Sequence, residues 1–173
     1  MKRFLLIASA CAGLAACEEA QLAGPGPTVG PPPPPSGAFR AADFGWSLSG
    51  GPDLIDGVLA YRGAGGRYTC SDVVLAPETP WSRERMRTLY LSTTSAALPV
   101  DDVKSRTTPE HGAEYARYAR HASCDAAGRI SFTNLPDGAW YVITVATPAA
   151  GGSKIAVMRR AETHGGAVRI VLR

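Results

Sequence analysis

One stretch, residues 124–148, restricts the fold of this chain more than any other. Residues 129–133 alternate polar and apolar side chains, which is the period of a half-buried strand. Residues 136–138 read Pro-Asp-Gly, which is turn chemistry, because proline presets φ, aspartate bonds its own backbone and glycine closes the turn without steric cost. Residues 139–147, rich in aromatic and β-branched side chains, are long enough for a central strand. The stretch therefore predicts two strands of a β-sandwich.

The N-terminus has the pattern of an export signal. Lys2 and Arg3 precede an apolar run over residues 4–16, which is shorter than the roughly 20 residues that span a bilayer and suits the apolar region of a signal peptide. The run ends in Leu-Ala-Ala-Cys at Cys17, which resembles a bacterial lipobox. We therefore expect residues 1–16 to be a lipoprotein signal peptide and Cys17 to carry lipid. The alternative is an ordinary signal peptide with a coincidental cysteine.

A lipidated Cys17 implies an anchor in the bacterial cell envelope. Each buried methylene contributes roughly 0.8 kcal/mol, so two or three acyl chains anchor a protein stably. Glu18 follows the cysteine, and inner-membrane retention in such lipoproteins favours aspartate there, so the outer membrane is preferred. Residues 17–42 comprise the lipidated cysteine and a Pro/Gly-rich linker, whose proline run favours a stiff spacer. Residues 43–173 form the globular domain, in the periplasm or at the cell surface.

The four cysteines divide between these segments. Cys11 would leave with the signal peptide and Cys17 would be lipidated, so Cys70 and Cys124 remain. An even pair in an exported domain predicts a disulfide. Closing a loop of this length would contribute roughly 4 kcal/mol through the entropy of the unfolded chain. Two free buried thiols are the alternative.

The charge balance argues against one class of partner. The chain has 18 basic and 15 acidic side chains, and removal of Lys2 and Arg3 leaves 16 and 15, a formal charge of +1. This balance offers no basic footprint for nucleic acid. The expected partners are a lipid membrane, through acylated Cys17, and an envelope protein or glycan.

Short strands and turns follow the linker. Residues 43–48 alternate weakly and predict an edge strand or an ordered lead-in, and residues 63–66 predict a turn. Further strands are predicted where apolar residues alternate, at residues 54–61, 67–76, 154–161 and 167–173. The rhythm predicts an all-β fold, an antiparallel Greek-key β-sandwich of about seven strands with a long loop and one short helix.

The segment over residues 78–110 is the hardest to interpret. Its first part predicts a short helix that begins near Pro80 and is capped by Ser82, and residues 92–110 predict a loop punctuated by prolines. Residues 114–123 fit both helical and strand spacing. We expect a strand there, because the segment leads directly into the turn before residue 129.

The segments now described resemble the carboxypeptidase regulatory-like domain, a prealbumin-like sandwich. That family's pattern is Asp-x-x-Gly-x-Phe-x-Phe-x-x-Leu-x-x-Gly-x-Tyr-x-Val. It is occupied here by Asp125, Gly128, Ile130 in place of phenylalanine, Phe132, Leu135, Gly138, Trp140 or Tyr141, and Val142 or Ile143. The resemblance implies a scaffold without catalytic residues that supports folding, assembly or binding, sometimes of carbohydrate. The long segment 78–110 and the two cysteines depart from the family, so any activity is expected on that segment.

The sequence contains no recognisable catalytic or metal-binding pattern. His111, His121 and His164 stand at no metal-ligand spacing. There is no Gly-x-Ser-x-Gly elbow, and the glycine-rich turn at residues 63–66 lacks the lysine and helix of a phosphate loop. We therefore expect no enzyme activity, no cofactor and no metal.

One candidate binding surface lies on the predicted helix. Arg83, Arg85 and Arg87 with Trp81 and Tyr90 could form a basic, aromatic surface for an acidic glycan or a partner protein. The alternative is a solvated helix face with Trp81 and Tyr90 in the core.

Two functions therefore stay open. The first is a non-catalytic envelope lipoprotein whose sandwich is a structural or protein-binding module. The alternative is a carbohydrate-binding module for cell-envelope glycans. Exposed tryptophans on a flat surface would favour the glycan, and three buried tryptophans would favour the structural function.

Overall fold

The computed structural model describes residues 37–63, 66–107 and 111–173. These residues belong to one compact unit, Pro34–Arg173. The predicted signal peptide, the lipid attachment at Cys17 and most of the linker lie outside the described residues, so they remain predictions.

The described residues form ten strands and four helices. The helices are the 3₁₀ helix η1 (Ala41–Leu48), α1 (Pro80–Tyr90), α2 (Val100–Ser105) and α3 (Gly112–Ala116). The strands are β1 (Asp53–Leu59), β2 (Arg62–Gly63), β3 (Gly66–Thr69), β4 (Asp72–Pro77), β5 (Ser95–Pro99), β6 (Arg120–Ser123), β7 (Arg129–Leu135), β8 (Gly138–Pro148), β9 (Ile155–Thr163) and β10 (Ala167–Leu172).

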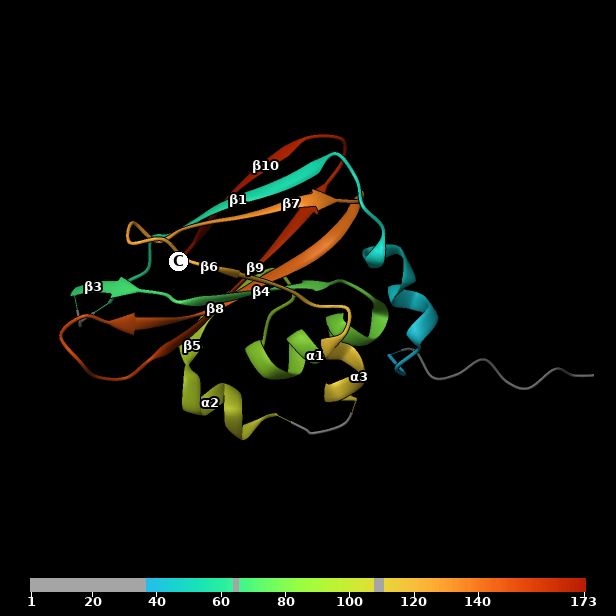
Figure 1. The fold of residues 1–173 in the computed structure, drawn as a ribbon. Coiled ribbons are helices and arrows are strands. Elements are labelled where there is room, and N and C mark those ends of the chain that lie inside the picture. The colour runs from blue at the N-terminus through green and yellow to red at the C-terminus, as the bar shows by residue number, and fades with distance from the viewer. Residues whose placement is uncertain (1–36, 64–65, 108–110) are drawn as a thin grey trace, which may run out of the picture. The chain divides into compact units, whose positions relative to one another are not determined.

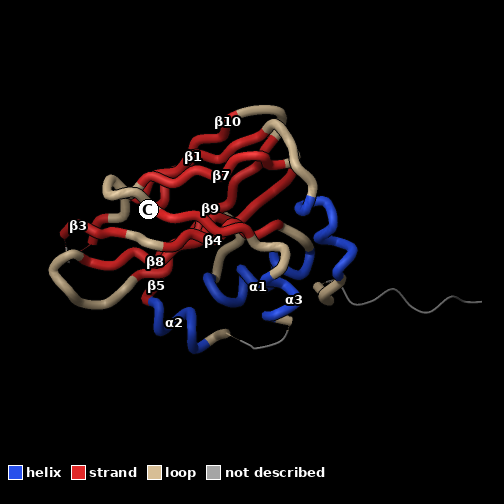
Figure 2. The backbone as a smooth tube through the Cα atoms, viewed as in Figure 1, coloured by secondary structure: helices blue, strands red, loops and turns tan. Residues whose placement is uncertain are grey.

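Two β-sheets pack face to face, as Figures 1 and 2 show. The smaller sheet has the order β10-β1-β7, in which β1 runs antiparallel to β7 and parallel to β10. The larger sheet has the order β2-β3-β8-β4-β6, with β9 paired to both β8 and β5. The predicted all-β sandwich is confirmed, with more strands than expected and one parallel pair.

The main core lies between the two sheets. The alternating residues of β7 place Ile130 and Phe132 inward, as the sequence predicts, and Ile55 of β1 packs beside them. From the larger sheet, Trp140 and Val157 are completely buried in the same cluster. The predicted hairpin over residues 129–147 is thus β7 and β8, and it contributes to both sheets.

A second core explains why β8 has little exposed surface. Helices α1, α2 and α3 lie on the outer face of the larger sheet (Figure 1). Met86 and Tyr90 of α1 pack there against Tyr141 and Met158. Successive residues of β8 therefore enter different cores, since side chains alternate across a sheet: Trp140 faces the smaller sheet and Tyr141 faces the helices.

The segment after α1 corrects the predicted loop over residues 92–110. Residues 95–99 form β5, which pairs with β9 from Ser95 opposite Arg159 to Pro99 opposite Ile155. The helix α2 follows and buries Val103. The sequence Ser-Ala-Ala-Leu-Pro has weak strand propensity, so tertiary pairing rather than local preference determines this strand. The prediction of a single helix is wrong for the same segment.

Three other local predictions change. The predicted strand over residues 114–123 is confirmed only in its second half, β6, and its first half belongs to helix α3. Residues 43–48 lie in the helix η1, which buries Phe44, rather than in a strand. The predicted strand over residues 67–76 divides into β3 and β4, because its pairing with β8 shifts by one residue between Thr69 opposite Thr147 and Val73 opposite Thr144.

The cap of helix α1 is Thr79 rather than Ser82. The Ser82 amide donates to Thr79 Oγ1 at 3.1 Å, and the Thr79 amide donates to Ser82 Oγ at 2.8 Å. This reciprocal arrangement is a capping box, which satisfies two amides at the helix start. Ser82 is therefore the third helical residue and half of the cap.

Candidate functional site

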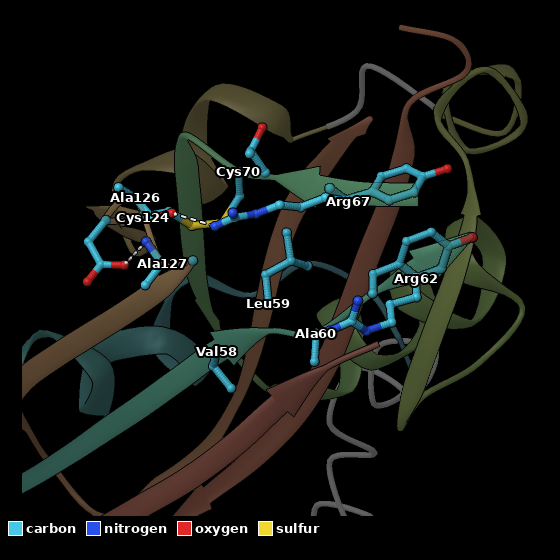
Figure 3. Close-up of a pocket in the computed structure, with 14 residues that line it drawn as sticks. Val58, Leu59, Ala60, Arg62, Arg67, Cys70, Cys124, Ala126 and Ala127 are labelled. Atoms are coloured by element: carbon cyan, nitrogen blue, oxygen red, sulfur yellow. Dashed lines mark hydrogen bonds between the residues drawn. A yellow bond between two sulfur atoms is a disulfide. The ribbon is translucent and has the colours of Figure 1, made fainter. Parts of the chain in front are cut away.

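A cavity of about 670 Å³ opens between strand β3, the end of β1 and the turn that follows Cys124. Figure 3 shows the residues that line it, with the disulfide on one wall and the long side chain of Arg67 extending towards Ala126. Such a volume is typical of small-molecule sites, which measure about 300–1,000 Å³. The cavity is therefore large enough for a small ligand.

Two tyrosines face each other at this cavity because the sequence is mirrored about a turn. Tyr61-Arg62 precedes the turn and Arg67-Tyr68 follows it. The hairpin register places Arg62 opposite Arg67. The rings of Tyr61 and Tyr68 meet edge to face, with centroids 4.9 Å apart, and both are half-buried. Each ring therefore has part of its surface available to a ligand.

The same register brings two positive charges together. Like charges directly opposite in a hairpin destabilise it. Arg67 Nη2 donates to the Ala126 carbonyl at 3.3 Å, which leaves its charge uncompensated. No described carboxylate makes an ion pair with Arg62 or Arg67. An anionic or hydroxyl-rich ligand would relieve this repulsion.

Asp125 also lines the cavity, but its carboxylate is occupied. Asp125 Oδ1 accepts hydrogen bonds from the amides of Ala127 and Arg129, both at 2.8 Å. Its other oxygen lies 3.6 Å from Arg129 Nε. The role of Asp125 is therefore to hold the turn, and the cavity keeps its basic character.

The predicted disulfide between Cys70 and Cys124 is confirmed. The two Cα atoms are 5.7 Å apart, and the Cys124 amide also donates to the Ser71 carbonyl at 2.8 Å. Both cysteines line the cavity. The bond therefore ties the β3 wall of the cavity to the wall formed by the turn before β7.

The basic, aromatic surface expected on α1 is not assembled as predicted. Tyr90 is buried in the second core, with 6% of its surface exposed, so it cannot contribute to a surface. Trp81 is half-buried, and the Arg85 guanidinium lies over its ring at 5.4 Å. Arg83 pairs with Glu78 at 2.6 Å, and Arg87 pairs with Glu84. The helix corresponds better to the alternative, a solvated face above a packed core.

The three tryptophans form no flat exposed platform. Trp140 is fully buried, and its Nε1 donates to Thr163 Oγ1 at 3.2 Å. Trp46 is half-buried and packs edge-on against Trp140, with centroids 4.8 Å apart. Trp81 packs against the Tyr115 ring at 5.0 Å. Their positions favour a structural function for all three.

A buried carboxylate ties α1 to the larger sheet. The side chain of Glu78 is only 4% exposed and lies 2.6 Å from Arg83 Nε and 2.5 Å from Arg160 Nε. It also accepts a hydrogen bond from the Tyr141 hydroxyl at 3.2 Å. Burial, together with the nearby Glu78 charge, raises the pKa of Tyr141 to about 12. All of these groups satisfy one another, so the cluster is structural.

The described ranges contain neither a cluster of metal ligands nor a helix that could cross a membrane. No group of three or more histidine, cysteine, aspartate or glutamate residues within them could hold a metal ion. No helix among the described residues is long and apolar enough to cross a membrane.

None of the four hairpin residues at the cavity was predicted from the sequence as a binding residue. Tyr61, Arg62, Arg67 and Tyr68 flank a turn that the sequence does predict, and their mirrored order was the available signal. Across a hairpin turn, residues at equal distance from the centre become neighbours. The sequence had instead pointed to the long segment 78–110 as the place for any function.

Comparison with known proteins supports the fold. No family model matches the chain, and no curated protein matches it. Among solved structures, a proposed carbohydrate-binding protein from Pseudomonas aeruginosa is similar at a TM-score of 0.55, with 18% identity, over 78% of this chain and 96% of that chain. A minor pilin from Streptococcus agalactiae aligns at a TM-score of 0.31, with 12% identity, over 69% of this chain and 49% of that chain, and carries no argument. The first likeness shows a shared β-sandwich fold.

Proposed function

We propose that this chain is a non-catalytic envelope lipoprotein whose sandwich, a carboxypeptidase regulatory-like domain, binds carbohydrate in the cavity that Tyr61 and Tyr68 line. The observation that carries the proposal is one cavity lined both by a pair of half-buried tyrosine rings and by two arginines without carboxylate partners among the described residues. Aromatic rings pack against the apolar faces of sugars, and guanidinium forks donate paired hydrogen bonds to oxygen ligands.

The charges of the cavity favour an acidic saccharide over a neutral one. Arg62 and Arg67 are directly opposite each other, and Asp125 is engaged by its own turn. A carboxylated or phosphorylated sugar would compensate both guanidinium charges, because charge-assisted hydrogen bonds are roughly twice as strong as neutral ones. The P. aeruginosa neighbour, described as a proposed carbohydrate-binding protein, is compatible with this function.

The proposed cellular location rests on the N-terminal sequence. Residues 1–16 would direct export, Cys17 would carry lipid, and Glu18 favours the outer membrane. The Pro/Gly-rich linker would then hold the cavity away from the bilayer, where envelope glycans are within reach.

Retention on purified glycans tests the carbohydrate proposal. The full-length chain in detergent would be passed over immobilised peptidoglycan, lipopolysaccharide and a neutral dextran. We expect retention on an acidic glycan. Tyr68→Ala should weaken it at least about fivefold, since an aromatic contact contributes roughly 1 kcal/mol beyond its buried area. Tyr68→Phe, which keeps the ring, is the matched control. Absence of retention on every glycan would overturn the proposal, and so would retention of Tyr61→Ala and Tyr68→Ala as strong as that of the wild type.

A structural or protein-binding module is the second candidate. The observation that favours it is the packing of Trp46, Trp81 and Trp140, none of which is an exposed side chain. Crosslinking in the native envelope, followed by identification of the partner, separates the two functions. Recovery of one protein partner from glycan-depleted envelopes would favour the second candidate.

A further inference from the structure

Strand β10 has one edge with which no described strand forms a backbone ladder. It lies at the end of the smaller sheet, where only β1 pairs with it. The carbonyls of Gly166 and Leu172 accept hydrogen bonds from the amides of Leu54 and Ala60 on the β1 side. Backbone groups alternate in direction along a strand, so the intervening Arg169 and Val171 direct their N–H and C=O groups towards the free edge. These groups form an open template for another strand.

A groove of about 490 Å³ lies along this edge. One wall is formed by the consecutive residues 168–171 of β10 together with Arg173, and the other by residues 159–162 of β9. Neighbouring side chains of a strand point to opposite faces of the sheet. Because consecutive residues line the groove, it runs along the edges of the two strands and not over one face. On its groove side, β9 pairs with β5 only as far as Arg159, and Arg160 donates its amide to the Thr94 carbonyl.

The groove is strongly basic. It is lined by four arginines and one glutamate, at Arg159, Arg160, Arg169, Arg173 and Glu162, which gives a formal charge of +3. Glu162 is already paired with Arg160 at 2.5 Å. Among the described residues no carboxylate pairs with the other three arginines.

We propose that this groove binds an extended segment of another protein, with alternating acidic and apolar residues, which adds to β10 as a further strand. Backbone pairing would supply affinity, as in other cases of strand addition. The acidic residues would lie beside Arg169 and Arg173 on the exposed face. The apolar residues would face Val168 and Ile170, which pack on the main core. The proposal gives the second candidate function a surface and a partner chemistry, and it is independent of the Tyr61–Tyr68 cavity.

Two observations favour this occupant over others. A second copy of the chain would bring Arg169 and Arg173 of both molecules together at a β10–β10 contact, and like charges on strand edges oppose such pairing. A glycan would use the arginines but not the row of unpaired backbone groups. An acidic extended peptide would pair with the arginines and also with the unpaired backbone groups of β10.

The probe is a fluorescent ten-residue peptide of alternating glutamate and valine, with blocked ends, added to the full-length chain in detergent. We expect saturable binding that weakens with salt, and slower amide exchange at Arg169 and Val171. Val171→Pro should abolish binding, because proline removes an edge-facing amide but keeps the bonds to β1, a position that edge strands tolerate. Val171→Thr, which keeps the amide, is the matched control.

A charge variant provides the second arm. Arg169→Glu should weaken peptide binding at least tenfold, whereas Lys104→Glu, an exposed reversal on α2, should leave it unchanged. Tyr61→Ala should also leave peptide binding unchanged. The peptide experiment therefore tests this inference independently of the carbohydrate proposal.

Three results would overturn the inference. The first is peptide binding that needs neither the acidic residues nor the strand edge. It would be seen as binding of a lysine–valine peptide equal to that of the glutamate–valine peptide, or as peptide binding retained by a folded Val171→Pro chain. The second is self-association that Val171→Pro abolishes, without peptide binding, which would identify a second copy as the occupant. The third is that the chain binds an acidic glycan but not the peptide, and that Arg169→Glu abolishes this glycan binding whereas Tyr61→Ala and Lys104→Glu do not.

Discussion

Cys70 and Cys124 are bonded to each other at the wall of the Tyr61–Tyr68 cavity and close a sequence separation of 54 residues. Cys70 lies between β3 and β4, and Cys124 directly follows β6. All of α1, β5, α2 and α3 lie within the closed loop. In the unfolded chain, this bond therefore restricts the segment that later forms the helices. In the folded chain, the same bond shapes the cavity.

Replacing both cysteines with alanine should lower the free energy of unfolding by about 4 kcal/mol, because the unfolded chain gains the entropy of an open loop. Chemical denaturation of the double variant and of the oxidised wild type measures this difference. Wild type treated with reductant should approach the variant. A double variant as stable as the oxidised wild type would contradict the prediction.

Gly138, which the family resemblance singles out, should tolerate no side chain. A Cβ at this position would lie 2.2 Å from the Trp46 ring, and the residue has a φ of +155°. Gly138→Ala should therefore cost roughly 3 kcal/mol, as overpacking and backbone strain combine.

Gly112→Ala is the matched control, because a Cβ there meets no atom within 4 Å. In helix α3 this change should be neutral or stabilising by up to about 1 kcal/mol. Thermal unfolding followed by tryptophan fluorescence compares the two. A Gly138→Ala chain with an unchanged Tm would show that Trp46 can move aside.

The hairpin and the helical layer show which parts of the fold a sequence can reveal. Residues 129–147 were predictable because their alternation, turn chemistry and burial all agree, and β7 and β8 follow them closely. β5 was not, because its alanines gain strand structure only from pairing with β9. The cavity was missed for a related reason: Tyr61 and Tyr68 become neighbours through a register that only the hairpin establishes.

Glu78→Gln should destabilise the fold by about 2 kcal/mol. The change leaves Arg160 without its buried partner and weakens the bond from Tyr141, and an uncompensated charge in a buried pair is costly. Glu84→Gln, within α1, also removes one negative charge that pairs with an arginine, but Glu84 and Arg87 are exposed, so its cost should stay below about 1 kcal/mol. Equal unfolding free energies for the two variants would contradict a structural role of Glu78.

Alkaline pH should unfold the chain through its buried tyrosines. Burial raises the pKa of Tyr90 to about 12, and burial with the Glu78 charge does the same for Tyr141. Unfolded tyrosines ionise near pH ~10, so the folded state holds these protons more tightly. Their stabilisation is complete below about pH 10 and is lost as pH rises towards 12.

Tyrosinate absorbance and circular dichroism measured together check the alkaline transition. Tyr90→Phe keeps the ring in the core and should reduce the loss of stability above pH ~10. Ionisation of all six tyrosines near pH ~10 with the fold intact would contradict the effect of burial on Tyr90 and Tyr141.

Cys17→Ser should release the chain from the membrane, because serine lacks the thiol to which lipid would be attached. In a Gram-negative host, the wild type should incorporate labelled palmitate and sediment with outer membranes, and the variant should do neither. Cys11→Ser, within the predicted signal peptide, is the matched control and should behave as the wild type. Glu18→Asp should move the protein towards the inner membrane. A wild-type chain that takes up no palmitate would instead support an ordinary signal peptide, with the β-sandwich released as a free domain.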